Sequence, residues 1–332
     1  MHAFLADMLQ CPVCAGMLQW RITARNGNRI EQADIRCFCC DTSYSVREGI
    51  GVFLPPDLPR NDLWEQTSSA LGRYLQAHPD VEQRLMSSPL ETLSPADRFY
   101  RALALEERGD FAQAMAIAQQ TLPLLYTAES LACHESQYQW VVDRLRDGHG
   151  PIVDLASGRG DLVQRIVREL RRPVVATDFS PRVLRRDRRA LQRVGLYDRV
   201  SLVAMDARRT PFRDGAVSTM TTNLGLPNIE RPGELLAELR RVVSGEFLAI
   251  THFYPGDDEA NLRVLREFGV APLLVRETFV ALMAQAGWQV QLENIRRGRA
   301  RPTPASELLD GARIDGLPVA ETTLEWCVAR AW

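Results

Sequence analysis

Residues 154–160 join a carboxylate to a small-residue turn, a pattern that can hold a polar or anionic ligand. Asp154 ends an apolar run, and Gly158 and Gly160 follow it with the spacing Asp-x-x-x-Gly-x-Gly. Glycine lets the backbone turn sharply and approach a ligand closely. The first N–H groups of the following helix, predicted over 161–170, attract polar or anionic groups. Val163 stands where a dinucleotide-binding fingerprint places its third glycine.

Polar residues also end the next predicted strands. Asp178 ends the strand 174–178, Asp206 follows the strand 200–205, and Asn223 follows the strand 216–222. In open α/β sheets, ligands bind beyond the carboxyl ends of the strands. A carboxylate can accept hydrogen bonds from both hydroxyls of a ribose. Each acid taken alone could instead cap a helix or form a surface ion pair.

The glycine turn followed by Asp178 resembles the first motif of the class I S-adenosylmethionine (SAM) dependent methyltransferases. The resemblance implies that Asp178 holds the ribose, Phe179 covers the adenine, Asp206 accepts its amine, and Asn223 faces the methionine end. The implied SAM-binding set is Asp154, Ala156, Ser157, Gly158, Gly160, Asp178, Phe179, Met205, Asp206, Ala207 and Asn223.

Catalytic residues are harder to identify from the sequence. Methyl transfer from a sulfonium is an in-line displacement, so alignment can supply most of the rate. His252 and Tyr254, after the strand 246–252, are candidates for a base or a shaping group, with a structural role as the alternative. Residues 223–228, Asn-Leu-Gly-Leu-Pro-Asn, depart from the motif of methylases that act on planar amino groups, which argues against that chemistry.

Five of the seven cysteines lie within residues 11–40, where thiol pairs have the spacing of a zinc ribbon. We predict Cys11, Cys14, Cys37 and Cys40 as ligands of one structural zinc ion, because both pairs then share one turn geometry. Cys39 is the alternative fourth ligand, and a reduced buried pair or a redox-active pair are further alternatives. Residues 8–55 resemble the small zinc-ribbon protein that activates several RNA and protein methyltransferases. Similar ribbons are fused to methyltransferases, including a family that methylates ribosomal RNA.

The order of elements predicts three segments. We expect a zinc ribbon over 1–58, a helical linker or lid over 59–148, and a methyltransferase domain over 149–332. Ser94-Pro95 reads as the start of a helix, and helices are expected over 98–108, 111–120 and 134–146. From residue 152, strands alternate with helices, and strands over 287–295 and 322–330 close the chain. The predicted fold is therefore α/β, a doubly wound Rossmann-like seven-stranded methyltransferase sheet with an N-terminal zinc ribbon and a helical insert.

The composition and net charge of the chain bear on the kinds of partner that it binds. The 332 residues carry a formal net charge of −2, so no overall basic field draws the protein to nucleic acid. We expect a cytoplasmic protein without a membrane segment, acting on a small molecule, a natural product or a peptide, with a homo-oligomer possible. The alternatives are an rRNA or tRNA methyltransferase and a non-catalytic methyltransferase-like binding partner. Two arginine clusters could hold RNA phosphates or form solvated surfaces, and we favour the second: Arg182, Arg185, Arg186, Arg188, Arg189 and Arg193, and Arg296, Arg297, Arg299 and Arg301.

Overall fold

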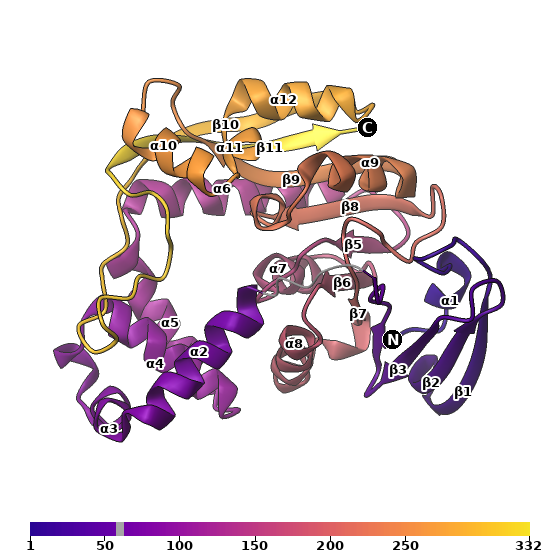
Figure 1. Ribbon diagram of the computed structural model, residues 1–332, viewed down its shortest axis with the longest axis horizontal. Helices are drawn as coiled ribbons and strands as arrows, with labels where there is room; N and C mark the ends of the chain where they lie inside the picture. The colour runs from indigo at the N-terminus through magenta and orange to yellow at the C-terminus, as the bar shows by residue number, and fades with distance from the viewer. Residues whose placement is uncertain (58–62) are drawn as a thin grey trace.

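A single mixed β-sheet runs through the protein, whose computed structural model describes residues 1–57 and 63–332 (Figure 1). Within these residues the sheet has 11 strands in the order β1-β2-β3-β4-β7-β6-β5-β8-β9-β11-β10. The strands are β1 (Leu18–Asn26), β2 (Arg29–Cys37), β3 (Ser43–Arg47), β4 (Ile50–Val52), β5 (Ile152–Asp154), β6 (Val174–Asp178), β7 (Val200–Ala204), β8 (Val217–Asn223), β9 (Val243–Phe253), β10 (Val290–Ala300) and β11 (Thr322–Ala331).

The central strands β7, β6, β5, β8 and β9 are parallel, and their order creates a switch point. From β5 the chain moves outward through β6 and β7, then returns to the other side of β5 for β8 and β9. A switch point is where open α/β sheets bind ligands. The closing strands β10 and β11 are antiparallel, and β11 lies between β9 and β10. The seven strands expected from residues 149–332 are thus present as β5 to β11.

Helices cover both faces of this sheet, as expected for a doubly wound fold. One face packs against α6 (Ala128–Leu145), α7 (Asp161–Glu169) and α8 (Pro181–Arg193) through buried aliphatic side chains. The other face packs against α9 (Pro232–Val242) and α12 (Arg276–Gln285). The predicted ranges 174–178 and 181–193 match β6 and α8 residue for residue.

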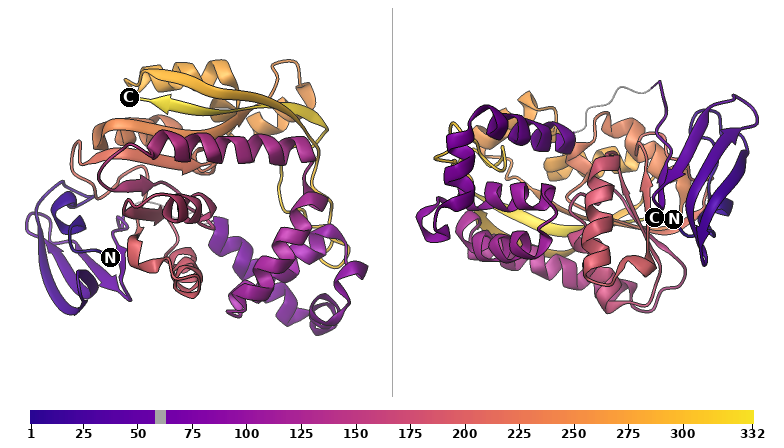
Figure 2. Two further views of the ribbon diagram at one scale, coloured as in Figure 1. Left: turned by 180° about the vertical axis from the view of Figure 1, so that it is seen from behind. Right: turned by 90° about the horizontal axis from the view of Figure 1, so that it is seen from below.

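The N-terminal segment extends this sheet, so the sheet has 11 strands where the sequence analysis expected seven. Strand β4 pairs in parallel with β7, with Ile50 opposite Leu202 and Val52 opposite Ala204. The amide of Phe53 continues the ladder to the carbonyl of Ala204 at 2.9 Å. The short helix α1 (Leu5–Met8) packs beside these strands (Figure 2). Pairing with β4 removes the exposed edge that β7 would otherwise present.

Residues 63–148 are helical in the part that the structure describes. They form α2 (Leu63–Ala77), α3 (Pro79–Ser87), the 3-10 turn η1 (Leu90–Thr92), α4 (Pro95–Glu107), α5 (Phe111–Leu125) and α6. Ser94 caps α4 with Pro95 at its first position, as predicted. Helix α6 begins at Ala128, earlier than the expected 134, because Thr127 caps it.

The connection between β10 and β11 reaches back to the helical region (Figure 1). The buried carboxylate of Asp97, on α4, accepts hydrogen bonds from the Ser306 hydroxyl and from the Leu308 amide. The side chains of Leu308 and Leu309 join the apolar cluster of α2, α3 and α4. The helical unit therefore includes part of the C-terminal segment 301–321, which lies outside the expected range 59–148.

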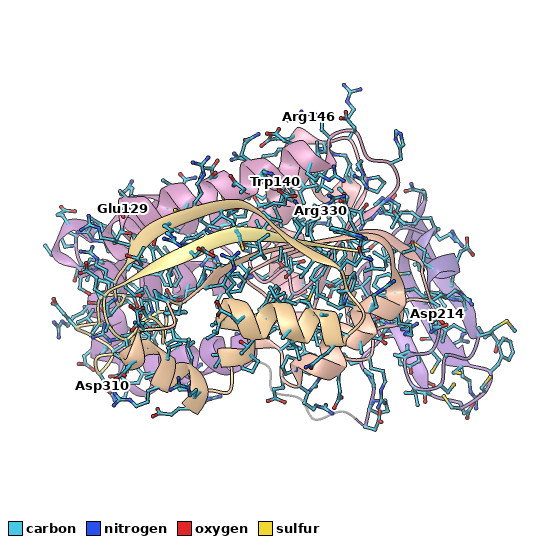
Figure 3. The ribbon with its side chains drawn as sticks, turned by 90° about the horizontal axis from the view of Figure 1, so that it is seen from above. Glu129, Trp140, Arg146, Asp214, Asp310 and Arg330 are labelled. Atoms are coloured by element: carbon cyan, nitrogen blue, oxygen red, sulfur yellow. The ribbon has the colours of Figure 1, made fainter. Side chains whose placement is uncertain are left out.

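Among the described residues, five of the ten arginines in the two clusters form ion pairs: Arg182, Arg186, Arg188, Arg297 and Arg299. On α8, Arg182 pairs with Glu107 at 2.7 Å and Arg188 pairs with Glu48 at 2.9 Å. On β10, Arg299 pairs with Glu129 at 2.8 Å. Seen from above, Glu129 and Arg146 lie toward opposite ends of α6 (Figure 3). Paired arginines favour a solvated, charge-balanced surface over a phosphate-binding one.

Across residues 1–57 and 63–332, no helix has both the length and the apolar character needed to cross a bilayer.

Candidate functional site

The glycine turn after β5 forms a tight loop that leads into α7. Gly158 and Gly160 adopt positive φ values of 53° and 71°, and Gly160 is the N-cap of α7. Ala156 also has a positive φ, 52°, a conformation that costs a non-glycine residue roughly 1–2 kcal/mol. Such backbone strain persists where the surrounding structure imposes it, often at functional sites.

Asp178, at the end of β6, is hydrogen-bonded to this loop. Its carboxylate accepts hydrogen bonds from the Gly158 amide at 3.0 Å and from the Ser180 amide at 2.9 Å. These two backbone hydrogen bonds fix the orientation of the carboxylate relative to the loop. The structure therefore places an oriented carboxyl group against the glycine loop, at the switch point of the sheet.

A cleft opens beside Asp178, between the ends of β5, β6 and β7 and the loop after β8. Six predicted cofactor residues lie on its wall: Ala156, Asp178, Phe179, Met205, Asp206 and Ala207. Six further lining residues were not predicted: Leu155, Thr177, Arg208, Asn228, Ile229 and Glu230. The wall thus carries three carboxylates, one arginine, one aromatic ring and several apolar side chains. Such a mixture of hydrogen-bonding groups and apolar surface suits a nucleoside, which has a diol and a flat base.

Asp206 reaches the cleft, but its carboxylate is already paired. Arg208 contacts both carboxylate oxygens, with Nε at 2.9 Å from Oδ1 and Nη2 at 2.6 Å from Oδ2. Both side chains are almost completely buried. A base in the cleft would therefore meet an Asp206–Arg208 pair rather than a lone acid. Apart from the two-residue spacing, no sequence pattern indicates this pair.

Other predicted cofactor residues support the cleft from behind. The Asp154 carboxyl group lies beneath the loop and accepts the Thr221 hydroxyl at 2.6 Å, and burial raises its pKa to about 6. The Ser157 hydroxyl donates to the Asp154 carbonyl at 3.1 Å. These contacts fix the loop, so Asp154 and Ser157 act on a ligand through the loop they hold, while Gly158 and Gly160 shape the loop itself.

Asn223, at the end of β8, is held by α6. Its Oδ1 lies 2.8 Å from His134 Nε2, and its amide donates to the Tyr138 hydroxyl at 2.9 Å. His134 therefore carries its proton on Nε2. Residues 223–225 adjoin the glycine loop, because a Cβ placed on Gly225 would lie 2.9 Å from the Ala156 Cβ. Sequence reasoning missed His134 and Tyr138, although the helix expected over 134–146 contained them.

His252 and Tyr254 lie in a row of five aromatic side chains that we call the ring band: Tyr138, His134, Trp326, His252 and Tyr254. Neighbouring ring centroids are 4.5 to 5.7 Å apart along this row. Burial lowers the pKa of His252 to about 4, with the neighbouring His134 adding to the effect. His252 is thus neutral at pH 7 and is a weak base there.

The low pKa of His252 predicts a specific pH dependence of stability. The unfolded chain, where the histidine pKa is about 6.5, takes up this proton first as the pH falls. The contribution of His252 is therefore fully present above pH 6.5 and is lost toward pH 4, by up to about 3 kcal/mol. We expect His252→Phe to flatten the loss of unfolding free energy on acidification, measured by urea unfolding between pH 5 and 7.5.

The raised pKa of Asp154 changes the stability in the opposite direction. As the pH rises toward 6, the carboxyl group ionises first in the unfolded chain, so the contribution of Asp154 to the stability falls. The test is therefore the difference between wild type and variant at each pH, in which the Asp154 contribution cancels. Parallel curves for the two proteins would show that His252 does not titrate in this way.

The predicted zinc ligands form a second candidate site. The ligand atoms of Cys11, Cys14, Cys37 and Cys40 all lie within 4.8 Å of one another. The two turns that carry them match: Ala15 and Asp41 adopt positive φ, and their amides bond back to the carbonyls of Cys11 and Cys37 respectively. Four clustered thiols suit tetrahedral zinc with Zn–S distances of about 2.3 Å. Cys39 is exposed and lies outside this group.

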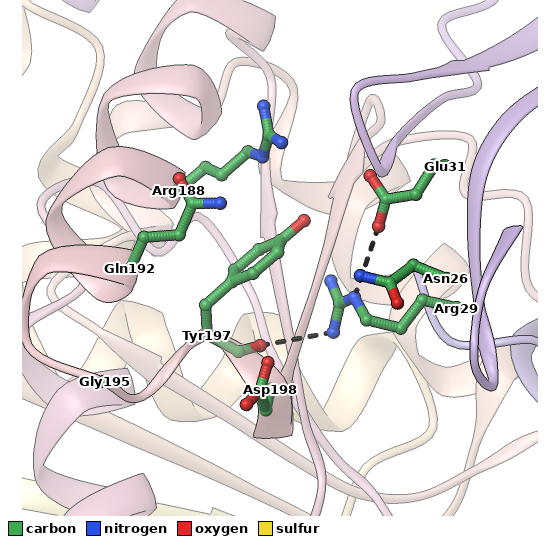
Figure 4. Close-up of a pocket in the computed structure, with 8 residues that line it drawn as sticks. All are labelled: Asn26, Arg29, Glu31, Arg188, Gln192, Gly195, Tyr197 and Asp198. Carbon is green, nitrogen blue, oxygen red and sulfur yellow. Dashed lines mark hydrogen bonds and ion pairs between the residues drawn. The ribbon is translucent and has the colours of Figure 1, made fainter. Parts of the chain in front are cut away.

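A polar pocket separates this N-terminal unit from α8 (Figure 4). Arg29 lies over the Tyr197 ring at 4.0 Å and donates to the carbonyls of Tyr197 and Val200. Glu31 lies 3.7 Å from Arg29 Nε. Since both signs of charge line the pocket and Arg29 binds main-chain carbonyls across it, we assign it a structural role in joining β2 to β7.

Part of the chain is similar to known proteins. Residues 152–245 match the family model described as a methyltransferase domain. This segment contains the glycine loop, Asp178, Asp206 and Asn223. The match covers the part of the chain that forms β5 to the start of β9 and the helices between them.

Curated relatives match over the same part of the chain. A ubiquinone/menaquinone biosynthesis C-methyltransferase of Acidiphilium cryptum is 30% identical over 138 residues, which are 41% of this chain and 51% of the relative. The corresponding protein of Cupriavidus necator is 36% identical over 101 residues, which are 30% of this chain and 40% of the relative. The chain spans about half the length, or less, of these relatives.

Solved structures are also similar to the chain. Geranyl diphosphate C-methyltransferase of Streptomyces coelicolor, in complex with Mg²⁺, geranyl diphosphate and S-adenosyl-L-homocysteine, has a TM-score of 0.43 and 16% identity. The match covers 59% of this chain and 79% of that one.

Proposed function

We propose that this protein transfers a methyl group from SAM to a small-molecule acceptor. The observation that carries the proposal is Asp178, fixed against the glycine loop at the wall of a cleft at the sheet's switch point. The relatives named above are C-methyltransferases of quinone biosynthesis, and their match over the cofactor half of the chain supports the reaction class.

The residues present fit SAM by the chemistry of their donors and acceptors. Asp178 would accept the ribose hydroxyls, Phe179 would cover the adenine, and the Asp206–Arg208 pair would meet its polar edge. When bound, SAM supplies an electrophilic methyl group on a positively charged sulfur. In a transfer, the bond from sulfur to methyl would break as the bond from methyl to acceptor formed, and a proton lost by the acceptor would pass to a base or to water.

We also propose that Cys11, Cys14, Cys37 and Cys40 bind one structural zinc ion and that residues 1–57 form a zinc ribbon. The ribbon would stabilise the sheet by continuing it past β7. The RNA alternative receives less support, because much of the arginine surface it requires is paired with carboxylates.

Calorimetric titration with S-adenosylhomocysteine and, in parallel, with NAD tests the proposed cofactor. We expect S-adenosylhomocysteine to bind and NAD not to bind. At a concentration of about 100 times its Kd, the bound ligand should add about 2.7 kcal/mol to the free energy of unfolding. Binding of NAD alone would indicate an oxidoreductase, and binding of neither would indicate a non-catalytic domain.

A further inference from the structure

We infer that the methyl acceptor is an electrically neutral, planar molecule that binds against the ring band. The inference rests on the proposed function, since it concerns the second substrate of the same site. Four observations carry it: the position of the ring band, its flat surfaces, its charge, and two buried polar atoms without partners.

The ring band lies beside the cofactor cleft. Tyr138 and His134 come from α6, Trp326 from β11, and His252 from the end of β9, so three elements distant in sequence converge there. Asn223 links the band to the end of β8, and the neighbouring residue Gly225 abuts the glycine loop. The side chains of His134, Tyr138, Asn223 and His252 retain partial exposure, so the band borders accessible space.

The rings offer flat surfaces that suit a planar molecule. His134 and Trp326 have centroids 5.2 Å apart at an interplanar angle of 32°, and His134 and Tyr138 are 4.5 Å apart at 35°. Aromatic side chains gain stabilisation from a favourably placed partner ring, beyond the burial of area. An aliphatic acceptor would gain only the burial.

The charge of the site opposes an anionic acceptor. Burial lowers the pKa of both His134 and His252 and raises that of Tyr138 and Tyr254, so all four are neutral at pH 7. Five carboxylates act on these rings: Asp154, Asp161, Glu135, Asp258 and Asp315. An anion there would be repelled by these carboxylates. A neutral acceptor avoids this penalty.

Two polar atoms in the band are buried without a hydrogen-bond partner among the described residues. They are Nε1 of Trp326, an obligate donor, and Nδ1 of His252. Trp326 is only 6% exposed. Buried polar groups in native proteins nearly always have partners, and a hydroxyl or carbonyl on the acceptor would supply one for the indole N–H.

The test uses two probes that share one ring system and differ in charge. 2-Naphthol and 2-naphthyl phosphate are titrated separately, by calorimetry, into protein saturated with S-adenosylhomocysteine. We expect 2-naphthol to bind at least tenfold more tightly than the phosphate ester. Equal or tighter binding of the phosphate ester, or binding of neither probe, would overturn the inference.

Two tryptophan variants test whether 2-naphthol binds at the ring band. Trp326→Phe keeps a six-membered ring but removes the N–H donor together with the five-membered ring that carries it, so it should weaken 2-naphthol binding at least fivefold, about the value of one hydrogen bond. The matched control is Trp332→Phe, at an exposed tryptophan whose Nε1 donates to Gln289, and it should leave binding unchanged. Circular dichroism checks the fold, and His252→Asn serves as a second variant if Trp326→Phe does not fold.

S-adenosylhomocysteine titration separates the two proposals. If that ligand does not bind, the proposed function fails, whatever the probes do. If S-adenosylhomocysteine binds but the protein does not prefer 2-naphthol to 2-naphthyl phosphate, only the acceptor assignment fails. The same conclusion follows if Trp326→Phe and Trp332→Phe bind 2-naphthol with equal affinity.

Discussion

Asp178→Ala is expected to weaken S-adenosylhomocysteine binding by well over tenfold. The substitution removes the acceptor assigned to the ribose hydroxyls and also releases the amides of Gly158 and Ser180. Hydrogen bonds to a charged group contribute about 1.5–3 kcal/mol each, and every 1.4 kcal/mol is a tenfold change in Kd. Calorimetric titration of folded variant and wild type measures the change directly.

Asp147→Ala is the matched control for this experiment. Asp147 is an exposed residue in the turn after α6, and its removal should leave the affinity unchanged. Asp178→Asn, which keeps one oxygen acceptor for the loop amides, should bind with intermediate affinity. Wild-type affinity in Asp178→Ala would refute the assignment of this carboxylate to the ribose.

Cys40→Ser is expected to abolish stoichiometric zinc and to destabilise the protein strongly. Wild type should carry about one zinc per chain, measured by plasma mass spectrometry. A small ribbon buries little apolar area, so the metal supplies much of its folding free energy, of the order of 10 kcal/mol in isolated zinc-binding peptides. Because β4 continues the sheet past β7, we expect the loss to lower the thermal midpoint of the whole chain.

Cys39→Ser provides the control within the same turn. Cys39 is exposed and lies outside the group of four converging thiols, so this variant should retain full zinc content. Loss of zinc from Cys39→Ser with retention in Cys40→Ser would move the fourth ligand to position 39. A folded wild-type protein that contains no zinc would contradict the proposed metal site.

Elements with strong local signals were predictable from the sequence. Ser94 and Pro95 start α4 as expected, because serine caps the free amides and proline fits the first turn. Strand β6 and helix α8 were predicted at their exact bounds, since a continuous apolar run and a capped amphipathic stretch leave little choice. The cysteine spacing likewise sufficed to identify the four thiols that converge.

Features that depend on long-range contacts were not predictable. Strand β4 has three residues, too few for a periodic pattern, and it is a strand because it pairs with β7. Segment 301–321 contains no helix or strand in the structure, and its position follows from the hydrogen bonds to Asp97, some 210 residues away. The early start of α6 was missed because the cap at Thr127 was overlooked.

The candidate site also combines features that were predictable from the sequence with features that were not. Strand ends and the glycine turn identified six residues on the cleft wall, because parallel strands must present their carboxyl ends at one edge. The pairing of Asp206 with Arg208, and the meeting of His134 with Asn223, depend on side-chain geometry that spacing does not reveal. The ring band has no sequence signature, since its members are scattered from position 134 to 326.

Transfer of label from methyl-tritiated SAM, catalysed by the purified protein in a bacterial extract, tests the central claim most directly. The extract is divided, and one half is treated with ribonuclease beforehand. We predict that the label enters a ribonuclease-resistant product that passes a small-pore filter, and that Asp178→Ala abolishes its formation. Label confined to ribonuclease-sensitive material would contradict the small-molecule assignment, and no transfer above the Asp178→Ala background would contradict the proposed activity.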